Sequence, residues 1–458
     1  MKHTKIICTI GPASLDVSLL RKMYSSGMDA VRINTVHGDI DQYESIIKTV
    51  RMIADIPIIM DVKGPDLRVS LINDLLVEKG TRIWVGFSKK EMVSFTGDCY
   101  KDVKIGDWIH FEDGILESKV IKKQRHKICI EFIKKGILKD KKNVSVIGRR
   151  LTIPSLTKND LVCIMLAKRL KIDYIALSYT RDAEDILNLR KLIGKSDIGI
   201  IAKIENPDGL KSIDPIIEAA QGVMVARGSL GVELPLQKVP MIQKSIIKKC
   251  IAKGKLVITA TQMLESMINN HRPTRAEASD VANAILDGSD AIMLSGETAI
   301  GKYPVKTVEV MASIAKEVEL NVGCQLCNES SSDLSDAITN SVYSLCQKTH
   351  IDHILILTKT GHTARMMSRF RSGKMLIAVT PDQNVKRKLH LFFGVFPVFF
   401  KAPVLDMGLH AILYCYHEKI LSKRDIVVCT GGMYTEKPMM SNLIHVQKVS
   451  DLIRYKDN

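Results

Sequence analysis

The sequence has few aromatic residues, and this limits what its positive charge can mean. Lysine and arginine outnumber aspartate and glutamate by 66 to 50, a formal net charge of +16, while aromatic residues fill only 5% of 458 positions. Basic runs interleaved with aromatic side chains are typical of nucleic-acid binding, and this sequence has no such run. We therefore expect no nucleic-acid partner, since anionic small molecules explain the charge at least as well.

Long hydrophobic runs are also missing. No stretch of 18 or more consecutive apolar residues occurs, so we expect no membrane-spanning helix and no membrane association. The first residues, MKHTKIICTIG, enter a strand-like pattern directly, without the apolar core of a signal peptide. These two observations favour a cytoplasmic protein.

Cysteine clusters of the metal-binding kind are absent as well. The ten cysteines are spread singly, and the one close pair, Cys324 and Cys327, has no second cysteine pair or histidine pair to complete a site. A structural zinc ion needs four such ligands. We interpret this pair as free thiols in a reducing compartment.

What the sequence does contain is a repeat of apolar strand-like runs and amphipathic segments over its first three hundred residues. Near-continuous Val, Ile, Leu and Ala runs are typical of parallel strands buried on both faces, and eight such units predict a closed (β/α)8 TIM barrel. The expected helices include Ser14–Ser26, Thr157–Leu170, Asp182–Ile193 and Pro304–Leu320. The expected strands are Thr4–Ile10, Ala30–Asn34, Ile56–Val62, Asp173–Ser178, Gly199–Ile204, Gly222–Ala226, Lys255–Ala260 and Asp290–Ser295.

Two regions do not follow this repeat. Residues 66–152 hold short alternating strands between Gly, Asp and Lys turns, which predicts a small all-β domain inserted in a barrel loop as a lid. A stretch rich in Asn and Ser then separates the barrel, residues 1–65 and 153–322, from a C-terminal α/β domain, residues 323–458. The expected strands of that last domain are His353–Leu357, Met375–Val379, Phe396–Phe399, Asp425–Cys429 and Leu443–Gln447, and its helices include Leu334–Gln347 and Asp406–Leu421.

Unusual polar residues follow seven of the eight strands. The carboxyl ends of barrel strands meet at one mouth, where this fold places its chemistry. Each residue alone is equally well explained as a cap or an ion pair, but several cations at one mouth would repel one another without an anionic ligand. Glu205 and Glu297 among them suit a hard divalent ion, so the pattern predicts a Mg²⁺-dependent enzyme acting on phosphate esters. The cations are Arg32, Lys63, Arg68, Lys203 and Arg227.

Motifs along nearly the whole chain resemble those of the pyruvate kinase family, in the same order and spacing. They are TKIICTIGPAS, GMDAVRINTVHG, DVKGPDLR, KIEN, MVARGSLGVE, ATQMLESM, RPTRAEASDVANAILDGSDAIMLSGETA and SNLIHV. The resemblance implies a glycolytic phosphotransferase that moves the phosphoryl group of phosphoenolpyruvate to ADP, giving pyruvate and ATP. It also implies a homotetramer.

The resemblance implies roles for individual residues at the mouth. Lys203 would stabilise charge on the phosphoryl group and the enolate, Arg32 would contact the phosphoryl group, and Thr261 would lie near the carbon that is protonated. The implied nucleotide side consists of Arg32, Arg68 and His37 in the barrel region and Asp113 and Lys142 on the lid. The implied substrate-binding residues are Arg32, Gly228, Ser229, Thr261, Ser295 and Glu297.

The metal sites depart from the family pattern. Glu205 matches one carboxylate of the divalent ion, Mg²⁺ or Mn²⁺, but Ser229 stands where the family has an aspartate, and a neutral hydroxyl is a weaker ligand. Three interpretations stay open: an active enzyme with weak or altered metal affinity, a ligand-binding pseudoenzyme or regulatory subunit, or another carboxylate that moves in.

The implied K⁺ site, Asn34, Asp61 and the carbonyl of Val62, lacks a serine oxygen because the residue at 36 is valine, so K⁺ dependence is also open. A Schiff-base aldolase using Lys203 is a further alternative, disfavoured by the two additional domains.

Overall fold

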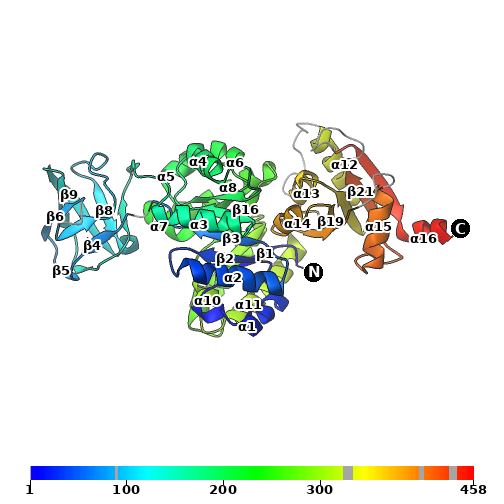
Figure 1. Ribbon diagram of the computed structural model, residues 1–458, viewed down its shortest axis with the longest axis horizontal. Helices are drawn as coiled ribbons and strands as arrows, with labels where there is room; N and C mark the ends of the chain where they lie inside the picture. Colours follow the sequence, from blue (N-terminus) through cyan, green and yellow to red (C-terminus); the bar gives the residue numbers. More distant parts are fainter. Residues whose placement is uncertain are drawn as a thin grey trace.

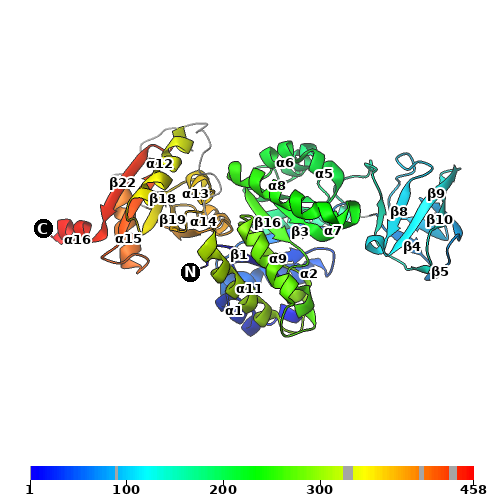
Figure 2. The ribbon, with the colours of Figure 1, turned by 180° about the vertical axis from the view of Figure 1, so that it is seen from behind.

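The computed structural model describes residues 2–65, 67–87, 91–322, 334–401, 407–432 and 441–457. Figure 1 shows three bodies in a row, with a β domain at one end, a β/α barrel in the middle and an α/β domain at the other end. Figure 2 shows the same order from behind. The predicted fold class is confirmed. Cys324 and Cys327 lie outside the described residues, and within them the cysteines are free and buried.

Eight parallel strands close into the barrel in the order β1-β17-β16-β15-β14-β13-β3-β2. All eight predicted strands are present. Each is buried along nearly its whole length, because its inner face packs in the barrel and its outer face packs against helices. The strands are β1 (Lys5–Thr9), β2 (Ala30–Asn34), β3 (Ile58–Val62), β13 (Tyr174–Leu177), β14 (Gly199–Ile204), β15 (Gly222–Ala226), β16 (Leu256–Ala260) and β17 (Ala291–Leu294).

Several barrel helices begin where a polar side chain accepts a free backbone N–H of the first turn, as at Asp16, Asp39, Thr157, Asp182 and Thr274. These caps fix where the chain turns from a loop into a helix. The helices of the barrel are α1 (Val17–Ser25), α2 (Ile40–Ile53), α3 (Lys158–Arg169), α4 (Ala183–Ile193), α5 (Pro207–Lys211), α6 (Ile213–Ala219), α7 (Arg227–Glu233), α8 (Val239–Ala252), α9 (Arg275–Leu286), α10 (Gly296–Ala299) and α11 (Pro304–Val318). Short 3₁₀ turns are η1 (Pro12–Ser14), η3 (Leu236–Lys238), η4 (Glu265–Ile268) and η5 (Glu319–Asn321).

The inserted domain follows β3 and is built of two mostly antiparallel sheets. The larger sheet has the order β12-β8-β9-β10-β6-β7-β4, and β11 pairs with β5. Its buried side chains form a cluster of their own, around Phe95, Phe111 and Phe132, that contains no barrel residue. Its elements are β4 (Val69–Leu71), β5 (Leu75–Val77), β6 (Arg82–Gly86), β7 (Val93–Phe95), β8 (Trp108–Phe111), η2 (Glu112–Gly114), β9 (Leu116–Gln124), β10 (Lys127–Phe132), β11 (Gly136–Leu138) and β12 (Val144–Val146).

The C-terminal domain is a five-stranded sheet of order β20-β19-β18-β21-β22, parallel except for β22. The predicted strands are all present. The elements are α12 (Leu334–Lys348), β18 (His353–Leu357), α13 (His362–Ser368), β19 (Met375–Thr380), α14 (Gln383–Leu389), β20 (Val395–Phe399), α15 (Met407–His417), β21 (Ile426–Gly431), β22 (Leu443–Lys448) and α16 (Val449–Asp457).

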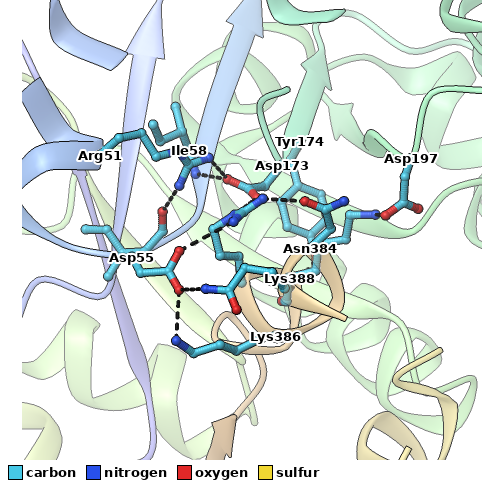
Figure 3. A network of polar contacts seen from close by, with 12 residues as sticks. Arg51, Asp55, Ile58, Asp173, Tyr174, Asp197, Asn384, Lys386 and Lys388 are labelled. Carbon is cyan, nitrogen blue, oxygen red and sulfur yellow. Dashed lines mark hydrogen bonds and ion pairs between the residues drawn. The ribbon is translucent and has the colours of Figure 1, made fainter. Parts of the chain in front are cut away.

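The barrel and the C-terminal domain share a buried cluster in addition to the core that each has of its own. A single buried cluster runs from residues inside the barrel, such as Ile7 and Met224, to residues of the C-terminal sheet, such as Ile354 and Ala378. Polar contacts surround this joint at the amino ends of the barrel strands (Figure 3). There the buried Asp173 accepts hydrogen bonds from Arg51 of α2, from the backbone of Ile58 and from Arg387 of α14.

Candidate active site

Asp61, near the end of β3, joins the buried cations at the mouth of the barrel. Its Oδ2 accepts a hydrogen bond from Nε of Arg32 at 2.8 Å, and its Oδ1 lies 3.1 Å from Nζ of Lys203. The Arg32 and Lys203 side chains are each 10% exposed, and that of Asp61 is 2% exposed. Strands β2, β3 and β14 therefore bring two predicted catalytic cations to one carboxylate.

The charges of this cluster support one another. Burial disfavours the ionised form of Asp61, but Lys203 and Arg32 outweigh it and hold the pKa of the carboxyl below its ordinary value. Burial also works against the ammonium of Lys203, but Asp61 and Glu205 raise its pKa above that of an ordinary lysine. Lys203 is thus a fixed positive charge at neutral pH, suited to stabilise an anion and not to accept a proton.

Two hydroxyls complete this cluster, and the sequence analysis gave neither of them a role. Ser178 Oγ lies 2.7 Å from Nζ of Lys203 and 3.2 Å from Oδ1 of Asp61, and Thr9 Oγ1 accepts from Nη1 of Arg32 at 3.1 Å. Thr9 is a polar residue in the otherwise apolar strand KIICT. That interruption of an apolar run is the signal that could have identified it.

Glu205 presents its carboxylate beside Lys203 and Ser229. Its Oε1 lies 3.2 Å from Nζ of Lys203 and 3.4 Å from Oγ of Ser229, and its Oε2 accepts the backbone N–H of Tyr179 at 2.6 Å. One carboxylate next to a hydroxyl fits a Mg²⁺ ion that takes its other ligands from substrate phosphate and water. Among the described residues no group of three or more His, Cys, Asp or Glu side chains could hold a metal.

Helix α7 and the loop after β16 form the next part of the mouth. Gly228 N donates to Thr261 Oγ1 at 2.8 Å, and that hydroxyl donates to the carbonyl of Ala260 at 2.6 Å. Both Thr261 and Gln262 have positive φ, 67° and 54°, so the loop turns sharply toward α7. The N–H of Gly228, implied by resemblance to bind the substrate, contacts Thr261 in this structure.

Arg227 is held within the protein. Its Nη1 lies 2.7 Å from Asp280 of α9, and its Nη2 donates to the carbonyls of Thr261 and Gln262. It therefore shapes the loop after β16 and is not a free cation facing an anion. Asp280 pairs with this charge, so Arg227 does not add to the repulsion that the sequence predicts among the cations at the mouth.

Ser295 and Glu297 follow β17 and are tied to the backbone. Glu297 is 2% exposed, and it accepts the N–H of Leu264 through Oε1 and that of Ser295 through Oε2. The buried Oγ of Ser295 has no hydrogen-bond partner among the described residues. Glu297 thus fixes the loops after β16 and β17 to each other, and the role in substrate binding stays a prediction.

The residues of the predicted K⁺ site lie on neighbouring strands, β2 and β3. Asn34 Oδ1 accepts the backbone N–H of Val36 at 3.3 Å, and the carbonyl of Asp61 accepts both the N–H and the hydroxyl of Thr35. Val62 is buried in β3. A monovalent ion at Asn34, Asp61 and Val62 stays a prediction.

The predicted nucleotide residues lie in three parts of the chain: His37 follows β2 of the barrel, Arg68 directly precedes β4, and Asp113 and Lys142 belong to the inserted domain. Arg68 Nη1 donates to the carbonyl of Lys141 at 2.6 Å, and Nζ of Lys142 pairs with Glu112 at 2.6 Å. His37, after β2, accepts a hydrogen bond at its carbonyl from Tyr43. Asp113 lies in η2 of the inserted domain.

A cleft separates the inserted domain from the barrel mouth. Its walls include Ser145 and Arg149 on one side and Tyr179, Arg181 and Glu233 on the other. Burial raises the pKa of Glu233, although a hydrogen bond with Ser145 across the cleft opposes the shift.

No helix in the described part of the chain is both long and apolar enough to cross a bilayer.

Comparisons with known proteins agree with this geometry. A family model for the pyruvate kinase barrel domain matches residues 1–308, and one for the pyruvate kinase alpha/beta domain matches residues 336–447. Similar curated proteins include pyruvate kinases of Bacillus licheniformis, 41% identical, Geobacillus stearothermophilus, 40% identical, and Staphylococcus haemolyticus, 38% identical. Each alignment covers 99% of this chain and 81% of the relative.

Proposed function

Because the chain belongs to the pyruvate kinase family, we propose that its barrel mouth transfers the phosphoryl group of phosphoenolpyruvate to ADP. The bond between phosphorus and the enol oxygen breaks, and a bond between phosphorus and a terminal oxygen of ADP forms. The enolate that leaves takes a proton on carbon and becomes pyruvate. The observation that carries the proposal is the buried cluster of Arg32, Asp61, Lys203 and Glu205.

Lys203 supplies the charge that this transfer needs. Its ammonium stays protonated beside Asp61 and Glu205, so it can stabilise negative charge on the phosphoryl group and on the enolate oxygen. Arg32, held by Asp61 and Thr9, presents a guanidinium beside it. Both cations are already oriented by the protein, so little reorganisation is needed when charge develops.

Glu205 and the Ser229 hydroxyl are the groups that would hold a divalent ion, Mg²⁺ or Mn²⁺. When bound, such an ion neutralises charge on phosphate oxygens and aligns the two reactants. Thr261 lies beside Gly228, on the loop after β16, and we assign it to the region where the enolate carbon is protonated. Closure of the inserted domain, with Lys142 and Asp113, would exclude water that competes as a phosphoryl acceptor.

The experiment is a coupled assay of pyruvate formation from phosphoenolpyruvate and ADP, with Mg²⁺, Mn²⁺ and Co²⁺ titrated in the presence and absence of K⁺. We expect turnover of at least about 1 s⁻¹, the low end for kinases. Lys203→Met should lower kcat at least about 100-fold, as the loss of one preorganised charge donor does elsewhere. Lys168→Met, on the exposed face of α3, is the control and should keep full activity.

The same assay separates this function from the alternative of a ligand-binding pseudoenzyme. A folded protein that binds phosphoenolpyruvate but turns over with none of these ions would overturn the proposal. Arg32, Lys203, Glu205 and Thr261 support turnover, whereas Ser229 is the residue on which the alternative rests. The substrates are metabolites of the cytoplasm, so we propose that location too.

We also propose the homotetramer that the family resemblance implies. The edge strand β22 exposes Ile444 and Val446, 38% and 46% exposed, on a strand that pairs on one side only within the described sheet. Such an edge favours pairing with another chain. Light scattering of the purified protein measures the assembly directly.

A further inference from the structure

The inserted domain joins the barrel through two linkers, and both lie against one loop. Linker one is residues 63–65 and 67–68, between β3 and β4, and linker two is residues 149–153, between β12 and α3. The loop after β13, residues Ser178–Arg181, lies between them. Because the inserted domain has a separate hydrophobic core, these linkers set where it sits over the mouth.

Linker one is held by an acid that accepts backbone N–H groups. The fully buried Asp160 of α3 accepts from Lys63 N at 2.8 Å and from Gly64 N at 3.2 Å. Gly64 has φ of +71°, and a Cβ there would come within 2.8 Å of the carbonyl oxygen of Ser178. The linker thus lies directly against the first residue of the loop.

Linker two is held by an arginine guanidinium that donates to backbone carbonyls. Nη1 of Arg181 donates to the carbonyls of Leu151 and Ile153, each at 2.9 Å. The guanidinium is fixed by Asp185 of α4, whose two oxygens accept from Nε at 3.1 Å and from Nη2 at 2.9 Å. Its side chain is only 16% exposed.

Thr152, which lies between Leu151 and Ile153 in the sequence, is bound to the inserted domain. Its N–H donates to Asp102 of the inserted domain at 2.8 Å, and its hydroxyl lies 2.9 Å from the same carboxylate oxygen. Along three successive residues the linker is therefore anchored to the barrel, to the inserted domain and to the barrel again. A rotation of the inserted domain about this linker strains the bonds to Arg181 or those to Asp102.

The loop that holds the linkers also holds the reacting centre. Ser178 bonds to Nζ of Lys203, and Tyr179 N donates to Glu205 at 2.6 Å, from a backbone with φ of +53°. Only Thr180 separates Tyr179 from Arg181. A displacement of the linker is thus transmitted by backbone to the carboxylate proposed to hold the metal ion.

We propose that Arg181 is a positioning residue that clamps the hinge of the inserted domain and so sets how that domain closes over the nucleotide. Arg181 touches no reacting atom. It acts through Leu151 and Ile153 on the position of the inserted domain, and through the loop 178–181 on Glu205. The kinetic part of this inference rests on the proposed function.

The chain carries its own probe for the test. Its two tryptophans, Trp84 in β6 and Trp108 in β8, both belong to the inserted domain, so tryptophan fluorescence reports on that domain alone. Time-resolved anisotropy of the full chain measures its motion without turnover. Arg181→Lys keeps a cation for Asp185 but loses the Nη1 group that donates to both carbonyls, and Arg169→Lys on α3 is the matched control.

We expect Arg181→Lys to add a fast anisotropy component and to raise the KM for ADP about tenfold, the effect of two lost hydrogen bonds of ordinary strength. The KM for phosphoenolpyruvate should change by less than about twofold, because that substrate binds on the barrel side, while Arg169→Lys should change neither KM. A second variant, Asp102→Leu, releases Thr152 from the other side of the hinge and should give the same anisotropy change.

Unchanged anisotropy in both hinge variants would overturn the inference, and so would an equal rise in the KM of both substrates, which indicates general damage to the mouth. If Arg181→Lys does not fold, the Asp102→Leu variant decides alone. A wild-type protein with no turnover would defeat the proposed function, while the anisotropy comparison would still test the hinge.

Discussion

At the scale of single residues, Lys203 and Asp61 determine the pH range in which the mouth keeps its charge. The pKa of Lys203 is raised above its ordinary value of 10.5 by Asp61 and Glu205 against the effect of burial. The ammonium is therefore fully present at neutral pH and is lost only as the pH rises through that raised value. The pKa of Asp61 is lowered below 3.8 by Lys203 and Arg32 against the effect of burial, so its charge is lost only as the pH falls through that lowered value.

Asp61→Asn removes one of the two acids that raise the pKa of Lys203. Burial is then opposed by Glu205 alone, so the pKa of Lys203 falls. We expect the alkaline limb of kcat against pH to move to lower pH in this variant. Ser178→Ala removes a neutral partner of Lys203, so the pH at which kcat falls on the alkaline side should stay close to that of the wild type. A limb that stays fixed in Asp61→Asn would show that some other group titrates there.

Ser229 is the second residue with a measurable consequence. Glu205 Oε1 lies 3.4 Å from its hydroxyl, so an aspartate at this position would place a second carboxylate beside the first. We expect Ser229→Asp to lower the Mg²⁺ concentration for half-maximal rate at least about tenfold, comparable to effects of ligand-supporting groups at metal sites. Ser196→Asp, on the loop before β14, is the control for added charge. An unchanged Mg²⁺ requirement would mean that Ser229 does not face the ion.

At the scale of elements, α14 connects the C-terminal domain to the barrel through three successive cations that pair with three acids of the barrel (Figure 3). Arg387 contacts two of these acids, Asp173 and Asp55. Lys386 pairs with Asp55, Arg387 with Asp173 and Lys388 with Asp197. The three acids precede strands β3, β13 and β14, so the helix spans the amino ends of three barrel strands. The acids differ in burial: the Asp173 side chain is 1% exposed and that of Asp197 is 63% exposed.

This difference in burial predicts different stabilities for two neighbouring substitutions. Arg387→Met leaves the buried Asp173 with one partner fewer and should lower the free energy of unfolding by about 2 kcal/mol. Lys388→Met breaks an exposed pair and should cost no more than about 0.5 kcal/mol. Urea unfolding of both variants measures the difference, and equal midpoints would contradict the importance of burial at this joint.

At the scale of the whole molecule, two of the three domains are joined by a shared hydrophobic cluster and the third is not. The barrel and the C-terminal sheet share a buried cluster, whereas the inserted domain has its own. A shared core resists relative motion because any displacement exposes apolar surface. The inserted domain is held by two linkers and a few polar contacts, so we expect it to move relative to the barrel more easily than the C-terminal domain does.

The sequence by itself determined the strands, the order of the domains and the family. A strand that is buried on both faces is a run of apolar residues, and this pattern can be recognised without knowing which strands it pairs with. For this reason the predicted bounds of Ala30–Asn34 and Gly199–Ile204 are those that the structure has. Motifs such as KIEN also placed Lys203 and Glu205 at a strand end, since that position depends only on local sequence.

Only the tertiary structure decided which groups meet. The sequence could not show that Arg227 is neutralised by Asp280, that Glu297 binds backbone N–H groups, or that Arg181 clamps Leu151 and Ile153. These contacts join residues from different β/α units, and no local pattern records how far apart two side chains lie in space. Closure of the barrel fixes those distances, and with them the charge and the partners of each residue at the mouth.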